Sequence, residues 1–388
     1  MALKKTIVIK PTLNCNLRCK YCYEFNRQEY KELNSHNMQV NDWINMIERF
    51  AEIFNESEIL WMLHGGEPLL LNKNSFEDIC KKIKEVNFKY GVNYKLALQT
   101  NATLIDEEWI EILKKYIDLF SERIISISID GPEYINDTTR IDLKGRGTYQ
   151  NIKQKIIDIK NIGLDVTTIS VVGQHNIDKI YEIYENIKDI NPNFSKFIPC
   201  YNLDKNGNVE KYGITPLQYA DTMCKLFDIW MKDMVNVKKI EDLRVIDPIV
   251  TIISSISNSF VAWCEYTNSK CDNFLTIYPN GEFWLCDTFQ QDIHKEYAYL
   301  GNYFEFSDLD LKDVLENCND YCKFKEFSNI LDVKCFNCDI KNICNGGCIA
   351  IRDSISKKSS KLFEQYCIGK HKLIGHIKEA VDSAMSKY

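Results

Sequence analysis

Residues 15–22, Cys15-Asn16-Leu17-Arg18-Cys19-Lys20-Tyr21-Cys22, carry three cysteines in the spacing C-x3-C-x2-C. Cysteine thiolates are the ligands that hold iron–sulfur clusters in proteins. Three of them can bind three irons of a four-iron cluster and leave the fourth iron open, and an open metal position is typical of a catalytic site. A zinc site, or a redox-active Cys19-x2-Cys22 pair with Cys15 incidental, is the alternative that this spacing leaves open.

The composition indicates a large globular protein. The chain has 388 residues, of which 45% are apolar, so it can bury the core of a barrel and an extension. Its formal net charge of −7, with both signs scattered along the chain, argues against a nucleic-acid partner, which requires a basic face. No stretch has the apolar length of a membrane span, and no signal-peptide core follows the N-terminus. We therefore expect a cytoplasmic protein with no membrane partner.

Sixteen cysteines are unusual in a cytoplasmic protein, because reducing conditions disfavour a disulfide framework. Most of them lie in the early group or in a late block, so metal or cluster ligation explains them better. Cys318 and Cys322, four residues apart on an expected helix, are predicted to be structural.

Residues 6–200 alternate short, nearly continuous apolar runs with amphipathic helical patterns. Such runs are typical of strands that are buried on both faces. The predicted strands are Ile7–Ile9, Ile59–Leu63, Tyr94–Leu98, Ile124–Ile129, Val166–Val172 and Phe194–Pro199. The alternation predicts an α/β fold with a parallel sheet, in the form of a partial (β/α)6 TIM-type barrel. We assign residues 1–200 to this barrel, 201–259 to a linker with bridging helices, and 260–388 to a C-terminal domain.

Capping residues predict several helix ends. Asp106 and Asn176 can each cap the start of a helix, and Gly163 can end another at a position where a positive φ is cheap. Thr215-Pro216-Leu217-Gln218 is a capping-box start for a helix that runs to about Met234. A further helix is expected over roughly 243–257.

Chemically suggestive residues follow four of the predicted strands. The cysteine loop follows the first, residues 64–68 (His-Gly-Gly-Glu-Pro) the second, residues 99–101 (Gln-Thr-Asn) the third and residues 130–132 (Asp-Gly-Pro) the fourth. Since the carboxyl ends of parallel strands meet at one edge, these four segments are expected to form one site.

A second group of cysteines lies near the C-terminus in the pattern C-x9-G-x4-C, then C-x2-C-x5-C-x3-C, then a last cysteine. Its members are Cys264, Cys271, Cys286, Cys335, Cys338, Cys344, Cys348 and Cys367. Eight cysteines fill two sites of four ligands, and the spacing alone leaves zinc open as the metal. Residues 278–282 read as a hairpin turn, which places Cys271 and Cys286 near one another.

Together these motifs resemble the radical S-adenosylmethionine (SAM) superfamily with a C-terminal SPASM extension. The resemblance rests on the early cysteine motif with Tyr21 before its last cysteine, on Gly65-Gly66-Glu67-Pro68, and on the late cysteine pattern. It implies one SAM-binding [4Fe–4S] cluster on Cys15, Cys19 and Cys22. In this superfamily the cluster and SAM produce a radical that abstracts hydrogen from an unactivated C–H bond.

The resemblance also implies contacts to SAM. Gly65 and Gly66 allow close backbone approach, Glu67 can receive the methionine ammonium, and Arg140 matches a position that meets the methionine carboxylate.

Three further residues match positions near the nucleoside of SAM. Ser128 resembles the ribose contact, and Tyr21 and Ile198 match positions that border the adenine.

The SPASM resemblance implies two auxiliary [4Fe–4S] clusters, which makes three clusters in all. The first would be held by Cys264, Cys271, Cys286 and Cys348. The second would be held by Cys335, Cys338, Cys344 and Cys367. Asp287, directly after Cys286, matches an aspartate that serves as the base in anaerobic sulfatase-maturing enzymes, although Thr288 replaces the histidine usual there. A solvated loop carboxylate is the alternative.

The family resemblance implies an oxidoreductase that acts on a peptide or protein. Residues 63–70 favour a maturase of a ribosomally made peptide, forming a thioether or carbon–carbon cross-link or otherwise oxidising a side chain. Sulfatase maturases, in contrast, tend to carry Gln before the glycines and Thr after the proline. The alternative is formylglycine formation on a Cys or Ser of a sulfatase. A flavodoxin- or ferredoxin-type electron donor is the expected second partner, and an iron–sulfur electron carrier without a substrate is the non-enzymatic alternative.

Overall fold

The computed structural model describes residues 4–26, 36–54, 58–235, 243–259, 263–267, 274–289, 291–316 and 335–385, and the single residues 237, 239, 261 and 271. Cys318 and Cys322 lie outside the described residues.

One curved sheet organises the molecule. Within the described residues its strand order is β10-β9-β8-β1-β2-β3-β4-β5-β6-β7, and every pair from β8 to β7 is parallel. The strands are β1 (Lys4–Ile9), β2 (Glu58–Leu63), β3 (Asn93–Thr100), β4 (Ile124–Ser128), β5 (Asp165–Val172), β6 (Phe194–Pro199), β7 (Val245–Asp247), β8 (Phe274–Ile277), β9 (Glu282–Trp284) and β10 (Tyr299–Asn302). The six predicted strands and the partial barrel are confirmed.

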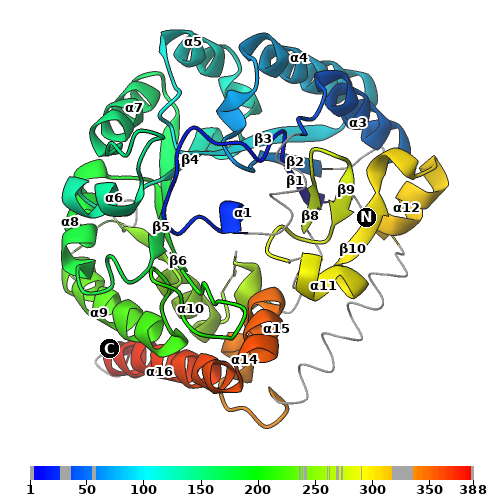
Figure 1. The fold of residues 1–388 in the computed structure, drawn as a ribbon. Helices are drawn as coiled ribbons and strands as arrows, with labels where there is room; N and C mark the ends of the chain where they lie inside the picture. Colours follow the sequence, from blue (N-terminus) through cyan, green and yellow to red (C-terminus); the bar gives the residue numbers. More distant parts are fainter. Residues whose placement is uncertain are drawn as a thin grey trace.

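Helices cover the outside of this sheet, as Figure 1 shows. They are α3 (Val40–Ile53), α4 (Lys73–Tyr90), α5 (Glu107–Lys115), α6 (Glu133–Thr139), α7 (Tyr149–Asn161), α8 (Ile180–Ile190) and α9 (Pro216–Met234). The strands alternate in burial, so that one face packs on the helices. On β3, for example, Tyr94, Leu96 and Leu98 join the same core as Phe76 of α4 and Trp109 of α5.

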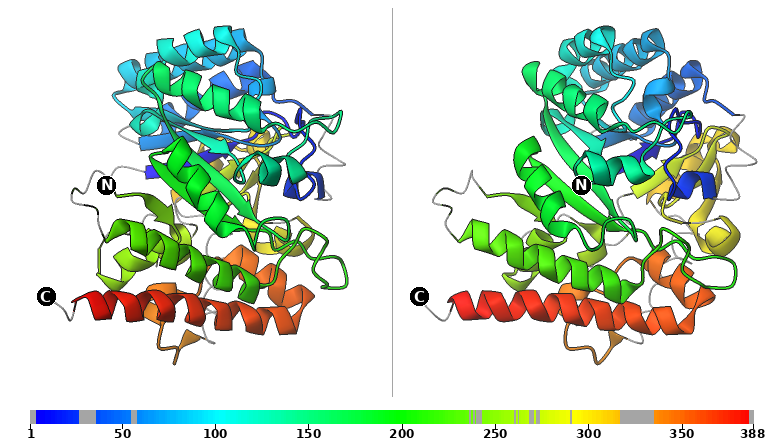
Figure 2. Two further views of the ribbon diagram at one scale, coloured as in Figure 1. Left: turned by 90° about the vertical axis from the view of Figure 1, so that its left-hand side faces the viewer. Right: turned by 60° about the vertical axis from the view of Figure 1, so that its left-hand side comes forward.

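The remaining helices belong to the N-terminal loop and the C-terminal part. They are α1 (Tyr23–Asn26), α10 (Ile249–Ile256), α11 (Gln291–Ala298), α12 (Asp308–Glu316), α14 (Lys341–Cys344), α15 (Ile349–Lys358) and α16 (Ser360–Met385). Figure 2 shows α16 running along α9, and the ring of His376 meets that of Phe227 at 5.6 Å. None of the helices among the described residues is long and apolar enough to cross a membrane.

Three of the predicted helix ends are confirmed. The Asp106 side chain accepts from the N–H of Trp109, Gly163 lies just after α7 at φ 86°, and Thr215 and Gln218 form the capping box of α9.

Two helix predictions need correction. Asn176 does not cap α8, which begins at Ile180; its side chain instead closes the turn after β5 by bonding Gly173 and Val171. The helix predicted over 243–257 is shorter, because Val245–Asp247 pairs with β6 as β7. The Asp247 carboxylate then accepts from the N–H of Thr251 in the first turn of α10.

The predicted turn at residues 278–282 is confirmed as the β8–β9 hairpin, with Gly281 at φ 85°. β8 pairs with β1, so the C-terminal part extends the barrel sheet at its first strand. This pairing brings Cys286 and Asp287, which follow β9, to the mouth of the barrel. The division into three domains stays a prediction.

Candidate active site at the barrel mouth

The cysteine loop is fixed by the segment after β2. The N–H groups of Gly66 and Glu67 donate to the carbonyls of Thr12 and Asn14 at 3.0 and 2.8 Å. A Cβ on Gly66 would lie 2.0 Å from the Asn14 carbonyl oxygen, and Gly65 has φ 116°. Only glycine permits this approach, so the two glycines hold the backbone of the cysteine loop.

Glu67 links the second and third strand ends. Its buried carboxylate accepts from the N–H of Leu69 at 3.0 Å, the Thr100 hydroxyl at 2.7 Å and the N–H of Asn101 at 2.9 Å. Burial raises the pKa of Glu67 despite these donors. Its contact with the methionine ammonium stays a prediction.

The three loop cysteines fit a cluster. Burial raises the pKa of Cys15 to about 12 and that of Cys22 to about 11, and the charge of each neighbouring thiolate adds to the effect. Metal binding would supply the positive charge that ionises them. Three N–H donors already point at the sulfurs: the backbone of Leu17 and the Asn101 side chain at Cys15, 3.3 and 3.7 Å away, and Arg140 at Cys19, 3.8 Å away. Hydrogen bonds to sulfur are among the features that tune a bound cluster.

Asp130 joins the fourth strand end to the cysteine loop. Its buried carboxylate accepts from the Tyr21 hydroxyl, from Arg140 Nε at 3.1 Å and from the N–H of Val171 at 2.9 Å. Burial opposes its ionisation, but Arg140, His175 and the Tyr21 hydroxyl together outweigh burial and lower the pKa of Asp130. Arg140 is thereby held beside Cys19, where a ligand carboxylate could reach it. That contact stays a prediction.

His175, which the sequence analysis missed, lies against Tyr21. The two rings stack at 5.4 Å between centroids, and His175 Nε2 lies 3.8 Å from Asp130. Its side chain is 1% exposed, and neither ring nitrogen has a hydrogen-bond partner among the described residues. Its position just after β5 was the available signal.

Ser128 and Ile198 share the inner face of the sheet. Ser128 lies opposite Ile169, and Ile198 lies opposite Val171. Ile169 and Val171 are two residues apart on β5, so all four side chains point to one face, and each is only half-buried. Their roles at the ribose and adenine stay predictions.

Several charged and polar side chains surround Asp287 at the barrel mouth. Tyr23 donates its hydroxyl to Asp287 Oδ2 at 3.1 Å, while Lys10 Nζ and His64 Nδ1 each lie 3.7 Å from that oxygen. Lys10 also donates to the buried carboxylate of Glu24. Asp287 is thus a polar centre of the mouth, and Lys10, Tyr23, Glu24 and His64 had not been predicted as its neighbours.

Three of the cysteines predicted for the first auxiliary cluster interact electrostatically. Burial raises the pKa of Cys286 to about 12, with further increases from Asp287 and Cys264. Burial also raises the pKa of Cys348, as do the charges of Glu265, Cys264 and Cys286. Cys271 packs on the same core as Cys286 and Cys348. This grouping fits one multi-sulfur site, and the ligand set stays a prediction.

The second predicted set surrounds the start of α14. The N–H of Cys338 donates to the carbonyl of Cys335 at 3.1 Å, and Cys338 and Cys344 pack on a shared core. Arg352 Nη1 donates to Cys335 Sγ at 3.6 Å, and His371 Nε2 lies 3.4 Å from Cys338 Sγ. Cys367, on α16, is exposed. These ligands also stay predictions.

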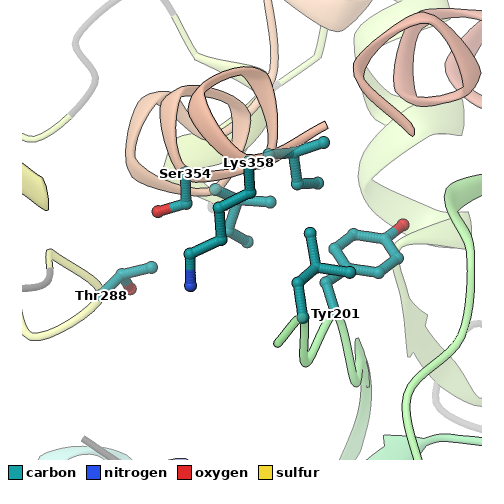
Figure 3. A pocket seen from close by; sticks show the side chains of 7 residues that line it. Tyr201, Thr288, Ser354 and Lys358 are labelled. Atoms are coloured by element: carbon teal, nitrogen blue, oxygen red, sulfur yellow. The ribbon is translucent and has the colours of Figure 1, made fainter. Parts of the chain in front are cut away.

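A cavity of about 60 Å³ lies between α15, the loop after β6 and Thr288, which follows Asp287 in the chain (Figure 3). Its lining residues are Tyr201, Leu203, Thr288, Ile351, Ser354, Ile355 and Lys358. Figure 3 shows the Lys358 ammonium pointing into this space between Thr288 and Tyr201. The cavity therefore offers apolar walls and one cation next to the site.

Residues 9–187 match the profile of the radical SAM superfamily, and the fold and the cysteine loop fit that class of enzyme. The cysteines of the C-terminal part fit the pattern of the SPASM-type maturases of that superfamily. Its cofactors are SAM and a [4Fe–4S] cluster.

Two of the curated relatives cover most of the chain. A cysteine-type anaerobic sulfatase-maturating enzyme of Clostridium novyi is 28% identical over 350 residues, which cover 88% of this chain and 87% of that protein. A serine-type anaerobic sulfatase-maturating enzyme of Bacteroides thetaiotaomicron is 24% identical over 395 residues, which cover 97% of this chain and 90% of that protein.

Solved structures share the fold. The structure of native anSMEcpe with bound AdoMet matches with a TM-score of 0.81 at 23% identity, over 99% of this chain and 100% of that one. The structure of Streptococcus suis SuiB bound to precursor peptide SuiA matches with a TM-score of 0.59 at 17% identity, over 91% of this chain and 74% of that one.

Proposed function

We propose that this enzyme oxidises a cysteine or serine side chain of a protein substrate to formylglycine. The sequence motifs alone had favoured a peptide cross-link, with formylglycine as the alternative. The relatives that cover nearly the whole chain are sulfatase-maturating enzymes of the cysteine and serine types, and they support the alternative.

The position of Asp287 carries the proposal. Oxidation of a C–H bond next to sulfur or oxygen requires a base near the carbon that loses hydrogen. Asp287 Oδ2 lies at the strand ends, 3.7 Å from His64 Nδ1, and His64 directly precedes the glycines that hold the cysteine loop. The carboxylate that follows the β8–β9 hairpin supports a base at the point where a substrate side chain would meet the predicted SAM site.

The proposed chemistry assigns roles to several side chains. When bound, the cluster and SAM supply abstraction of a hydrogen atom from an unactivated C–H bond. Cys15, Cys19 and Cys22 would hold the cluster, and Arg140 would orient the carboxylate of SAM. Asp287 accepts the proton of the substrate thiol or hydroxyl.

The substrate then has lost one hydrogen atom, one proton and one electron. We propose an iron–sulfur centre held by the C-terminal cysteines as the electron acceptor. A cysteine becomes a thioaldehyde, which water converts to the aldehyde with release of hydrogen sulfide. A serine gives the aldehyde directly.

Mass spectrometry and aldehyde trapping test this proposal. The anaerobically reconstituted enzyme is incubated with SAM, dithionite and a cysteine-containing sulfatase peptide. The peptide should exchange one sulfur and two hydrogens for one oxygen and should then react with a hydrazine reagent. A peptide that remains unmodified, while SAM is cleaved, would reject formylglycine formation on that substrate.

A cross-linking maturase is the second candidate, and two residues favour it. His64 stands where the sulfatase maturases tend to carry Gln, and Thr288 stands where they usually carry His. Both flank Asp287, so the immediate surroundings of the base differ from that pattern. A cross-linked peptide would lose two hydrogens and fail to react with hydrazine.

Two further features belong to the proposal. The C-terminal cysteines would bind two auxiliary [4Fe–4S] clusters, and a flavodoxin- or ferredoxin-type protein would supply electrons. The cavity lined by Thr288 would receive a substrate side chain close to the reacting residue, because Thr288 directly follows Asp287 in the chain.

A further inference from the structure

We infer that Lys10 is the positioning residue for Asp287 and sets the orientation of the carboxylate that serves as the base. This inference rests on the role proposed for Asp287. It adds the residue that follows the first barrel strand to a site whose base comes from the C-terminal part.

Lys10 is placed by the pairing of β1 with β8. It directly follows β1, and its N–H donates to the carbonyl of Ile277 at the end of β8 at 3.0 Å. Its side chain is fully buried, and its ammonium lies 4.7 Å from the centre of the Tyr278 ring. A cation over an aromatic face in a desolvated site is held in place by that ring. Lys10 is thus a fixed charge and not a mobile surface lysine.

The groups around Lys10 are those of a cation site. One ligand atom each from Glu24, His64 and Asp287 lie within 4.8 Å of one another. Two carboxylates this close, one of them buried, require a positive charge between them. The Lys10 ammonium provides it, since it donates to Glu24 and lies 3.7 Å from Asp287 Oδ2.

The contacts to Asp287 converge on one of its oxygens. Tyr23, Lys10 and His64 all approach Oδ2, at 3.1, 3.7 and 3.7 Å. Because Oδ2 is attracted from these directions, the rotation of the Asp287 carboxylate is restricted. A catalytic base must be held in a fixed orientation toward the proton that it accepts. Lys10 brings a full positive charge to this oxygen, whereas Tyr23 is a neutral donor and His64 is charged only when it is protonated.

A purely structural role is the competing explanation. Glu24 is 3% exposed, so Lys10 could serve only to neutralise it. Removing Lys10 alone would leave an uncompensated buried carboxylate and would destabilise the fold. The double variant Lys10→Met/Glu24→Gln separates the two roles, because it removes both charges of the buried pair and preserves their volume.

The experiment measures product formed per 5′-deoxyadenosine released. The holoenzymes compared are wild type, Lys10→Arg, Lys10→Met/Glu24→Gln, Glu24→Gln alone, and Lys84→Met as a matched loss of an exposed lysine on α4. Iron content checks cluster loading in each. We expect the double variant to load iron and cleave SAM but to form on the order of 10- to 100-fold less product per SAM cleaved. Lys10→Arg should restore most of the coupling, and Lys84→Met should leave it close to that of wild type. Glu24→Gln keeps the Lys10 charge, so it should lose less coupling than the double variant.

Wild-type coupling in the double variant would overturn the inference, because Lys10 would then only neutralise Glu24. A crystal structure of the double variant tests the inference without any substrate. Failure of the proposed function would be seen separately, as a wild-type enzyme that modifies no peptide. An Asp287 carboxylate displaced from Tyr23 and His64 supports the inference. An unmoved carboxylate contradicts it.

Discussion

At the scale of single residues, the site depends on close approach and on charge. Gly66 allows the backbone after β2 to touch the cysteine loop, and Asp130 holds Arg140 beside Cys19. The cysteines themselves are half-buried thiols whose raised pKa values oppose ionisation until a metal is bound. A substitution at any of these residues therefore has an expected effect on the site.

Gly66→Ala should disrupt the cysteine loop. Its Cβ would lie 2.0 Å from the Asn14 carbonyl, so the loop must move, and overpacking of this kind costs about 1–3 kcal/mol. We expect a lower iron content after reconstitution and loss of SAM cleavage, measured by iron assay and chromatography of 5′-deoxyadenosine. The control is Gly375→Ala, where a Cβ meets nothing within 4 Å. Equal iron content in both variants would show that close approach is not required.

Asp287→Asn should separate the two half-reactions. The amide keeps the shape of the side chain but cannot accept the substrate proton, so product formation should fall by about 10²- to 10⁴-fold. SAM cleavage should stay measurable, because the contacts that hold the cysteine loop are unchanged. Product formed at the wild-type rate would show that Asp287 is a loop carboxylate without a catalytic role.

At the scale of helices and strands, most of the barrel followed from local sequence. Strands such as Val166–Val172 and caps such as Asp106 and Thr215 are defined by residues close in the chain. β7 was missed because three residues carry too little periodicity to outweigh the helical pattern around them. The addition of β8 to β1 joins residues near 276 to residues near 8, and no local pattern encodes such a pairing.

The same distinction applies to the site. The cysteine motif and the glycines were identified because their spacing is local. Lys10 and His175 were missed because their partners come from distant parts of the chain: Asp287 beside Lys10, and Asp130 and Tyr21 beside His175. The placement of each just after a strand was the signal that could have identified them.

Thr215→Ala tests one of the predicted caps. Loss of the capping box of α9 should lower the free energy of unfolding by about 1 kcal/mol, measured by urea denaturation. Product formation should persist, because the contacts that build the site do not involve this cap. Thr215→Ser, which keeps the hydroxyl, should retain stability. An unchanged denaturation midpoint in Thr215→Ala would show that the cap contributes nothing.

At the scale of the whole molecule, two cysteine groups are joined by one sheet and a buried polar network. Lys370 of α16 donates to Glu265 at 2.5 Å and to the Tyr266 hydroxyl at 3.0 Å. Glu265 and Tyr266 directly follow Cys264 in the chain. Tyr366 donates to Glu265 at 3.0 Å and accepts from the N–H of Cys348 at 3.2 Å. α16 therefore fixes the surroundings of the first predicted cluster while carrying Cys367 of the second.

The number of clusters is a further prediction. Replacing Cys335, Cys338 and Cys344 together with Ala should remove one four-iron cluster, so iron and sulfide should each fall by about one third. SAM cleavage should continue, because the N-terminal cysteines are intact. Zinc in the wild-type protein, with no change in iron in the variant, would show that this site binds zinc.

Cleavage of SAM tests the central claim most directly. The protein is reconstituted anaerobically with iron and sulfide, reduced with dithionite and given SAM, and 5′-deoxyadenosine is measured by chromatography. We predict its formation by the wild-type protein and its absence in Cys15→Ala/Cys19→Ala/Cys22→Ala. A fully loaded wild-type protein that releases no 5′-deoxyadenosine, even with its substrate present, would contradict the account.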